Sequence, residues 1–440
     1  MKHLSARILR RTSVSLLILS AAIPGAHAQE LPLNTSSNST ATLDGLVAEA
    51  LEKSPELRFY KAEIAAAKGS RLTAGQFANP ELGAGIGQKT IRGGGLNVEG
   101  LSWSVSIMQP FEWPGRLGLR KAIANQDIEL AELGLARFKT ALAGRMRTVA
   151  YSLFAAQEKA KAAEEVADRF KSLREVMVQR DPAGLTPLLE TRVIEATELN
   201  TQRKASEALL SAQRAVLELN QLRGVAPETR VSVGQTGLRF RPPEKPAALM
   251  SSAMTNNFEL RVRAIELAQQ GFRVELARNE RFQGFSVGPM VSEDRAGDRE
   301  RIIGVGLTIP LPLWNRNAGN IETAKARQVQ AETSLYITHR EVERKVMDAA
   351  LTYESKLREM TKWRPDSVKH FKDASVLADR HYRLGAVPIA TYVELQKQYL
   401  EAVESLLDTK KEALEAAAQL EVLTGFDLPF VSMAAPEEAK

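Results

Sequence analysis

The chain contains no cysteine in its 440 residues. This absence excludes a disulfide framework, a thiolate metal site, a thiol nucleophile and a lipid-modified N-terminal cysteine. Histidine is scarce as well, because only His339, His370 and His381 lie beyond residue 28, and no two of them have the helical i, i+4 spacing of metal ligands. We therefore expect no bound metal, no cofactor and no catalytic residue set, so the sequence does not predict an enzyme.

No stretch beyond the first thirty residues is long and apolar enough to span a bilayer as a helix. The first thirty contain a basic segment that ends at Arg11, an apolar run over 14–19, and small residues at Ala26 and Ala28. This order predicts a secretory signal peptide over 1–28, followed by an N-terminal linker over 29–41. A transmembrane anchor is the weaker alternative, because the run has about ten apolar residues and a span needs about twenty.

The chain has little excess of positive charge. Lysine and arginine number 59 and aspartate and glutamate 53, which gives a net charge of +6. Removal of residues 1–28 takes away four basic residues and no acidic ones, so the remaining net charge is +2. Nucleic-acid binding needs a clustered basic face. The composition therefore predicts no nucleic-acid partner.

Four short segments of the first half return in the second half, in the same order and about 200 positions later. The pairs are 54–58 with 256–261, 110–116 with 310–316, 183–188 with 384–389, and 222–224 with 423–425. A proline-rich segment separates the copies. We therefore expect repeat 1 over 42–224, a linker over 225–247, repeat 2 over 248–425 and a C-terminal tail over 426–440.

Each repeat contains two segments in which apolar residues alternate with small ones, the period of two that is typical of strands. They lie at about 82–87, 101–107, 285–292 and 303–309. The polar face is almost wholly serine, glycine and threonine, whereas a soluble sandwich presents larger polar residues outward. The pattern favours a membrane barrel with lipid outside and a wet interior.

Four strands are too few to close a barrel, and an open edge in lipid leaves backbone groups unpaired. We therefore expect the chain to form an oligomer that shares one barrel. A dimer, trimer or tetramer would supply eight, twelve or sixteen strands, and strand geometry alone does not choose among them.

Long helices are predicted after each strand pair. Apolar residues keep a seven-residue spacing from Ile128 to Met177, which indicates a helix over about 114–180 with a length of roughly 100 Å. Shorter helices over about 54–77 and 185–223 together match that length. The fold class is thus mainly α with a membrane β part, in which a cylinder of helices continues the barrel. A secreted helical scaffold is the alternative if the helices are considered alone.

Three strings at the strand ends carry a family resemblance. They are Asn79-Pro80-Glu81-Leu82, then Gln109-Pro110-Phe111-Glu112 followed by Gly115-Arg116, and the segment Ile309–Asn320. Over roughly 42–425 the chain resembles the TolC family of outer-membrane efflux channels, and the last string resembles its cobalt-zinc-cadmium metal-exporter branch. The resemblance implies a homotrimer with a 12-stranded barrel in outer-membrane lipid and a twelve-helix tunnel in the periplasm. It also implies two partners, a periplasmic adaptor (membrane fusion) protein and an inner-membrane RND-type pump.

The resemblance further implies roles at the periplasmic helix turns. The adaptor is expected to dock on the turns that contain Gly184 with Leu185 and Gly385 with Ala386. Each glycine is equally explained as a helix-ending residue in the left-handed conformation.

In the same family, carboxylates six and nine residues after the second turn glycine narrow the closed pore. The corresponding residues here are Thr391 and Glu394, so one carboxylate is absent, and Val387 replaces an arginine that ties the turns together. Tyr382 matches an aromatic residue of the drug-exporter branch. The candidate pore constriction is therefore Tyr382, Thr391 and Glu394.

The expected function is a passive outer-membrane exit duct for substrates that an inner-membrane pump drives, with divalent heavy-metal cations as the substrate class. A channel of the same fold for drugs or other organic solutes is the alternative.

Overall fold

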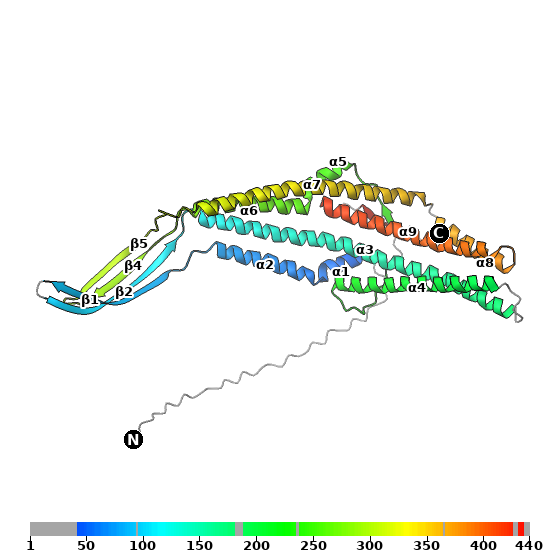
Figure 1. Ribbon diagram of the computed structural model, residues 1–440, viewed down its shortest axis with the longest axis horizontal. Coiled ribbons are helices and arrows are strands. Elements are labelled where there is room, and N and C mark those ends of the chain that lie inside the picture. The colour runs from blue at the N-terminus through cyan, green and yellow to red at the C-terminus, as the bar shows by residue number, and fades with distance from the viewer. Residues whose placement is uncertain are drawn as a thin grey trace, which may run out of the picture. The chain divides into compact units, whose positions relative to one another are not determined.

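The computed structural model describes residues 42–93, 96–180, 188–234, 237–363, 366–425 and 430–434. The signal peptide and linker expected over 1–41 lie outside them. In chain order the elements in Figure 1 are α1 (Leu43–Lys53), α2 (Glu56–Ala74), β1 (Glu81–Gly93), β2 (Leu96–Phe111), α3 (Arg116–Arg180), α4 (Leu188–Arg223), β3 (Gly237–Phe240), α5 (Pro246–Asn256), α6 (Phe258–Asn279), β4 (Phe285–Asp294), β5 (Glu300–Thr308), α7 (Ala318–Lys362), α8 (Ser367–Arg383), α9 (Ile389–Thr424) and β6 (Val431–Ala434).

The order of elements repeats, as the sequence predicts. The series α2, β1, β2, α3, α4 corresponds to α6, β4, β5, α7 with α8, and α9. The halves differ in the long helix, because α3 is one helix of 65 residues whereas its counterpart is divided into α7 with 45 and α8 with 17. The sequence has Pro365 between α7 and α8, and a proline removes a helical hydrogen bond and clashes with the preceding turn.

The helix expected over 54–77 is α2, and a further helix, α1, precedes it. The side chain of Thr42 accepts a hydrogen bond from the N–H of Gly45, which caps the start of α1. Pro55 separates α1 from α2 and lies directly before the first residue of α2, where its missing N–H leaves no helical bond unmade.

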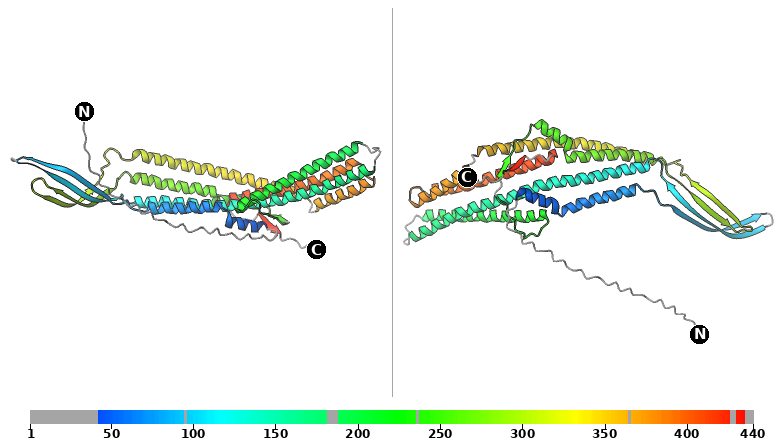
Figure 2. Two further views of the ribbon diagram at one scale, coloured as in Figure 1. Left: turned by 90° about the horizontal axis from the view of Figure 1, so that it is seen from below. Right: turned by 180° about the vertical axis from the view of Figure 1, so that it is seen from behind.

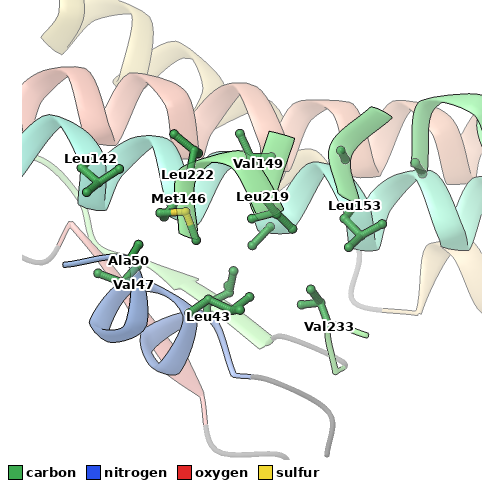
Figure 3. Close-up of a cluster of buried hydrophobic side chains, with 14 of the residues drawn as sticks. Leu43, Val47, Ala50, Leu142, Met146, Val149, Leu153, Leu219, Leu222 and Val233 are labelled. Atoms are coloured by element: carbon green, nitrogen blue, oxygen red, sulfur yellow. The ribbon is translucent and has the colours of Figure 1, made fainter. Parts of the chain in front are cut away.

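The helices of the first half pack around α3. Figure 1 shows α1 and α2 beside one part of α3 and α4 beside the other. Figure 3 shows the cluster where α1, α3 and α4 meet, which includes Leu43, Val47, Leu142, Met146, Val149, Leu153, Leu219 and Leu222. Positions 142, 149, 156, 163 and 170 of the seven-residue pattern are all buried, so the predicted helical stripe is confirmed. None of the described helices combines the length and apolar composition that crossing a membrane requires.

A small sheet of β3 and β6 joins two segments that were expected only as a linker and a tail. The hydroxyl of Tyr353 on α7 lies 2.8 Å from the carbonyl oxygen of Arg241 and 3.1 Å from that of Phe430. The rings of Tyr353 and Phe430 also meet edge to face at 5.7 Å. These contacts attach the segments that flank β3 and β6 to the second half of the helical core.

The other four strands form an antiparallel sheet in the order β1-β2-β4-β5, so β1 and β5 are its edges. Both views of Figure 2 show this sheet beyond one end of α3 and α7, away from α4 and α8. The register aligns Ala84, Val105, Val291 and Ile303 in one row of one face, which we call the apolar face. The adjacent row on the opposite face contains Gly85, Ser104 and Ser292, and we call this the small-residue face. The predicted alternation is therefore confirmed, with Met108, Met290 and Ile302 as exceptions on the small-residue face.

Glycine is required at one close approach of β4 to β2. A Cβ atom at Gly288 would collide with the carbonyl oxygen of Ile107. The residue after it, Pro289, has no N–H to offer to the ladder. The close approach and the missing donor coincide with a gap in the pairing of β2 with β4 between Ser106 and Gln109.

We expect Met146→Ala to lower the free energy of unfolding by about 2–5 kcal/mol, because Met146 is completely buried where α1, α3 and α4 meet and its removal leaves a cavity. Met347→Ala on α7 is the matched control, since that side chain is 39% exposed, and its effect should be below about 1 kcal/mol. Denaturant unfolding of the purified protein in detergent measures both. Equal effects of the two substitutions would contradict the assignment of this core.

Candidate functional site

The turn between α8 and α9 contains a left-handed glycine. Gly385 has φ of 74°, and its N–H donates to the carbonyl oxygen of Tyr382 at 2.9 Å. The N–H of Ala386 donates to the carbonyl oxygen of His381, also at 2.9 Å. This pair of bonds is the Schellman motif that ends many helices. No atom lies within 4 Å of a Cβ built on Gly385, so the backbone conformation rather than crowding calls for glycine here.

Of the four residues expected to dock an adaptor, Gly385 and Ala386 are described and both are exposed. They therefore present open backbone at the end of the α8–α9 pair. Gly184 and Leu185, expected in the equivalent turn between α3 and α4, lie outside the described residues.

Two tyrosines stack directly behind this turn. The rings of Tyr382 on α8 and Tyr392 on α9 are 5.2 Å apart and nearly parallel. The hydroxyl of Tyr382 donates to Glu190 of α4 at 3.4 Å, and that of Tyr392 donates to Asp379 of α8 at 3.2 Å. Burial, and then the nearby carboxylate, raises the pKa of each tyrosine, so both remain protonated donors at neutral pH. Tyr382 thus links the α8–α9 pair to α4.

A buried polar group of three side chains lies one to two helical turns further from the end. Arg169 on α3 donates at 3.0 Å to both Ser375 on α8 and Gln396 on α9. Gln396 also donates to the backbone carbonyl oxygen of Ser375 at 2.7 Å. Ser375 and Gln396 are both fully buried, so their hydrogen bonds cannot be replaced by water without opening the packing. This group fixes α8 and α9 against α3.

Thr391 and Glu394 lie on a different side of α9. They are three residues apart on one exposed helix face, and Glu394 accepts a hydrogen bond from Gln398 at 2.9 Å. Tyr392 and Gln396 are on the buried face. The three residues of the candidate constriction therefore do not form one contact cluster within a single chain, because Tyr382 faces the packed interior while Thr391 and Glu394 face away from it.

No sequence pattern predicts the roles of Glu190, Asp379 and Arg169. Their partners are 13 to 227 positions away in the sequence, so no local pattern connects them. One local signal was available, because Gln396 stands between Tyr392 and Tyr399 in the buried stripe of α9. A polar residue in such a stripe indicates a buried hydrogen-bonded partner.

Metal-binding geometry is absent from the part of the chain that the structure describes, where no group of three or more histidine, cysteine, aspartate or glutamate residues could hold an ion. His339 lies 3.5 Å from Glu343, one helical turn along α7.

Aromatic side chains mark both ends of the apolar face of the sheet. Near the helices, Phe111 stacks on Phe285 at 5.5 Å and Trp113 stacks on Phe282 at 5.2 Å. Toward the hairpin tips the register places Trp103 on the same face, next to Ile86. Aromatic belts of this kind occur at the two interfaces of a membrane.

Comparison with known families identifies the fold. The sequence model of the family described as outer membrane efflux protein matches residues 46–225 and again 249–426. The chain belongs to this family. Membership places this efflux protein in the outer membrane of a Gram-negative cell envelope, with its helices extending into the periplasm.

Two relatives of this efflux protein are named after different cargoes. The cobalt-zinc-cadmium resistance protein CzcC of Cupriavidus metallidurans is 26% identical over 52% of the chain, and the alignment spans only about half of that relative, 54%. The pyoverdine export outer membrane protein OpmQ of Pseudomonas aeruginosa is 23% identical over 86% of the chain and 84% of the relative. Among solved structures, the CmeC outer membrane channel of Campylobacter jejuni superposes with a TM-score of 0.69 at 14% identity, over 92% of this chain and 93% of that one. The similarity to CmeC shows that the two chains share a fold.

We expect Tyr382→Phe to speed amide hydrogen exchange in the last turn of α8, because the substitution removes the hydroxyl that contacts Glu190 on α4. The loss in stability should be no more than about 1 kcal/mol, since the bond is long and only partly buried. Tyr336→Phe is the matched control, because that side chain is 67% exposed on α7. Unchanged exchange in α8 would show that the hydroxyl does not restrain this end of the helices.

Proposed function

We propose that this protein is the passive exit duct of a tripartite efflux system and works as a homotrimer. The observation that carries the proposal is the four-stranded sheet of an efflux-family chain, whose two edges, β1 and β5, have no partner within the described residues. Side chains of the apolar face along these edges are highly exposed, with Ile86 at 82% and Ile303 and Val305 at 74% each. Three copies would pair β1 of one chain with β5 of the next in a twelve-stranded barrel that has no free edge in lipid.

The helices support the same proposal. The sheet connects directly to α3 and α7, so a closed ring of sheets brings three copies of the helical part into one cylinder. In that cylinder the exposed face of α9 with Thr391 and Glu394 lines the duct near its periplasmic end, and the turns with Gly385 and Gly184 form the rim. The adaptor protein docks at this rim and connects the duct to an inner-membrane pump of RND type.

The proposed cargo is divalent heavy-metal cations. Support comes from the segment Pro310–Asn320, which resembles the metal-exporter branch, and from the match to a cobalt-zinc-cadmium resistance protein. The second candidate is export of an organic solute, because the match to a pyoverdine exporter extends over 86% of the chain. The two differ only in cargo.

A deletion strain separates the two cargo classes. We expect loss of the protein to sensitise cells to cobalt, zinc or cadmium salts, and the wild-type chain supplied in trans to restore growth. The triple variant His339→Gln, His370→Gln, His381→Gln should restore growth equally, because we propose that the duct does not select the ion. Sensitivity to organic toxins alone, with normal metal tolerance, would contradict the metal assignment and favour the organic-solute channel.

The proposed constriction is tested by replacing Glu394. Threefold symmetry brings three copies of this carboxylate around one axis, where they attract cations. We expect the purified channel to have the mass of three chains in detergent, and Glu394→Gln to lower its cation selectivity in planar bilayers. Glu401→Gln is the matched control, since Glu401 is exposed two turns further along α9 and paired with Lys397.

A detergent-solubilised monomer with intact strands would contradict the shared barrel. Equal selectivity of wild type, Glu394→Gln and Glu401→Gln would instead contradict only the constriction.

A further inference from the structure

The hairpin between β4 and β5 contains a carboxylate that is surrounded by arginines. The side chain of Glu293 is fully buried by three of them, although each arginine side chain is itself more than half exposed. Arg295 donates to Glu293 Oε1 at 2.8 Å, Arg299 donates to Oε2 at 2.7 Å, and Arg301 donates to Oε2 at 2.9 Å. One negative charge therefore holds three positive charges together, and an excess of two positive charges remains at the surface.

The register places this arginine cluster at the end of the apolar face. Glu293 pairs with Trp103 on β2 and with Arg301 on β5, so all three lie in one row. The neighbouring row toward the helices is the wholly apolar one that contains Val105 and Val291. Adjacent rows of one face are two residues apart, or about 7 Å along a strand. The arginine cluster thus begins directly where the wholly apolar rows of the apolar face end. We call these rows the apolar band.

The small-residue face of the same rim has the opposite charge. There Lys89 is 3.1 Å from Asp294 and 2.9 Å from Glu300, which gives a net charge of −1. On the apolar face the described rim also contains Arg92 and Glu99, and Glu99 accepts a hydrogen bond from Gln88 at 2.8 Å. On the face that meets the membrane Arg92 balances Glu99, and Glu293 with its three arginines keeps an excess of +2. Asp298 at the tip of the hairpin adds one further negative charge, so the tip as a whole keeps +1 on this side.

The arginines have unused hydrogen-bonding capacity. Four of their guanidinium N–H groups donate to Glu293 within the described residues. Each guanidinium has five N–H donors in a planar fork that matches the oxygens of a phosphate. A structural ion pair with Glu293 needs one arginine, so three arginines on one carboxylate, half exposed at a membrane boundary, leave a preorganised set of donors for a second anion.

We propose that this arginine cluster binds the phosphate groups of the glycolipid that forms the outer leaflet of the outer membrane. The hairpin is at the end of the sheet opposite the periplasmic helices, so its apolar face meets the outer leaflet. The headgroup of this glycolipid, lipid A, carries phosphate monoesters on its sugars at the depth where the apolar band ends. The site rests on the outer-membrane location of the family and is independent of the cargo proposed above.

Lipid binding to the purified full-length channel in detergent tests the proposal. Bisphosphorylated lipid A is titrated and compared with monophosphoryl lipid A and with phosphatidylglycerol. We expect the double variant Arg299→Gln, Arg301→Gln to bind bisphosphorylated lipid A about tenfold more weakly, because Arg295 still pairs with Glu293 but the excess charge is lost. Arg340→Gln is the matched control, since that arginine is exposed on periplasmic α7 and pairs with Glu343.

Wild-type affinity for lipid A in the double arginine variant overturns the proposal.

If the double variant does not assemble, the single variant Arg299→Gln replaces it, because it leaves two arginines on Glu293. Arg299→Gln must then bind lipid A more weakly than Arg340→Gln does. Equal affinity of these two variants overturns the proposal. Binding of phosphatidylglycerol with the same affinity and the same losses overturns the assignment to the phosphorylated glycolipid.

Discussion

The unpaired backbone at the edges of β1 and β5 is the constraint on which the rest of this structure depends. In hydrocarbon each unsatisfied N–H or carbonyl group costs several kcal/mol. Soluble proteins protect their edge strands with charge, proline or bulges. Here β1 has 13 residues and β5 has 9, and over the apolar band their side chains are only apolar or glycine. Such edges are built to be paired, and pairing with further copies of the chain is the arrangement that also aligns the helices.

The two halves of the helical part reach a similar length in different ways. In the first half α3 is continuous over 65 residues, so backbone hydrogen bonds alone keep its two ends in register. In the second half the interruption between α7 and α8 removes that continuity. The position of α8 then depends on side chains, through the hydrogen bond of Arg169 to Ser375. The contact of Phe170 with Tyr392 and the hydrogen bond of Arg169 to Gln396 hold the neighbouring α9 against the same helix. Side-chain contacts with α3 therefore position α8 and the first part of α9.

What the sequence could predict follows from the range of each interaction. Strand alternation and the seven-residue stripe of α3 are local patterns, and the structure confirms both. Strands β3 and β6 have four residues each and pair segments almost two hundred positions apart, so no alternation indicated them. The division of α7 from α8 was foreseeable from Pro365 but was not predicted. Two further features depend on which elements pack together, and sequence periodicity carries no information about that packing. They are the contact of Tyr382 with Glu190 and the three arginines around Glu293.

The neighbours Glu293 and Asp294 show that strand alternation places charged residues as well as apolar ones. Successive side chains of a strand point to opposite faces. Glu293 therefore lies on the apolar face among three arginines, while Asp294 lies on the small-residue face and pairs with Lys89. A shift of one residue in the pairing of β4 would exchange the two carboxylates and separate each from its cations. Within lipid that shift is already disfavoured, because it would turn the apolar side chains of β4 to the small-residue face. At the rim, beyond the hydrocarbon, there are no apolar rows to fix the register, and there the ion pairs disfavour the shift.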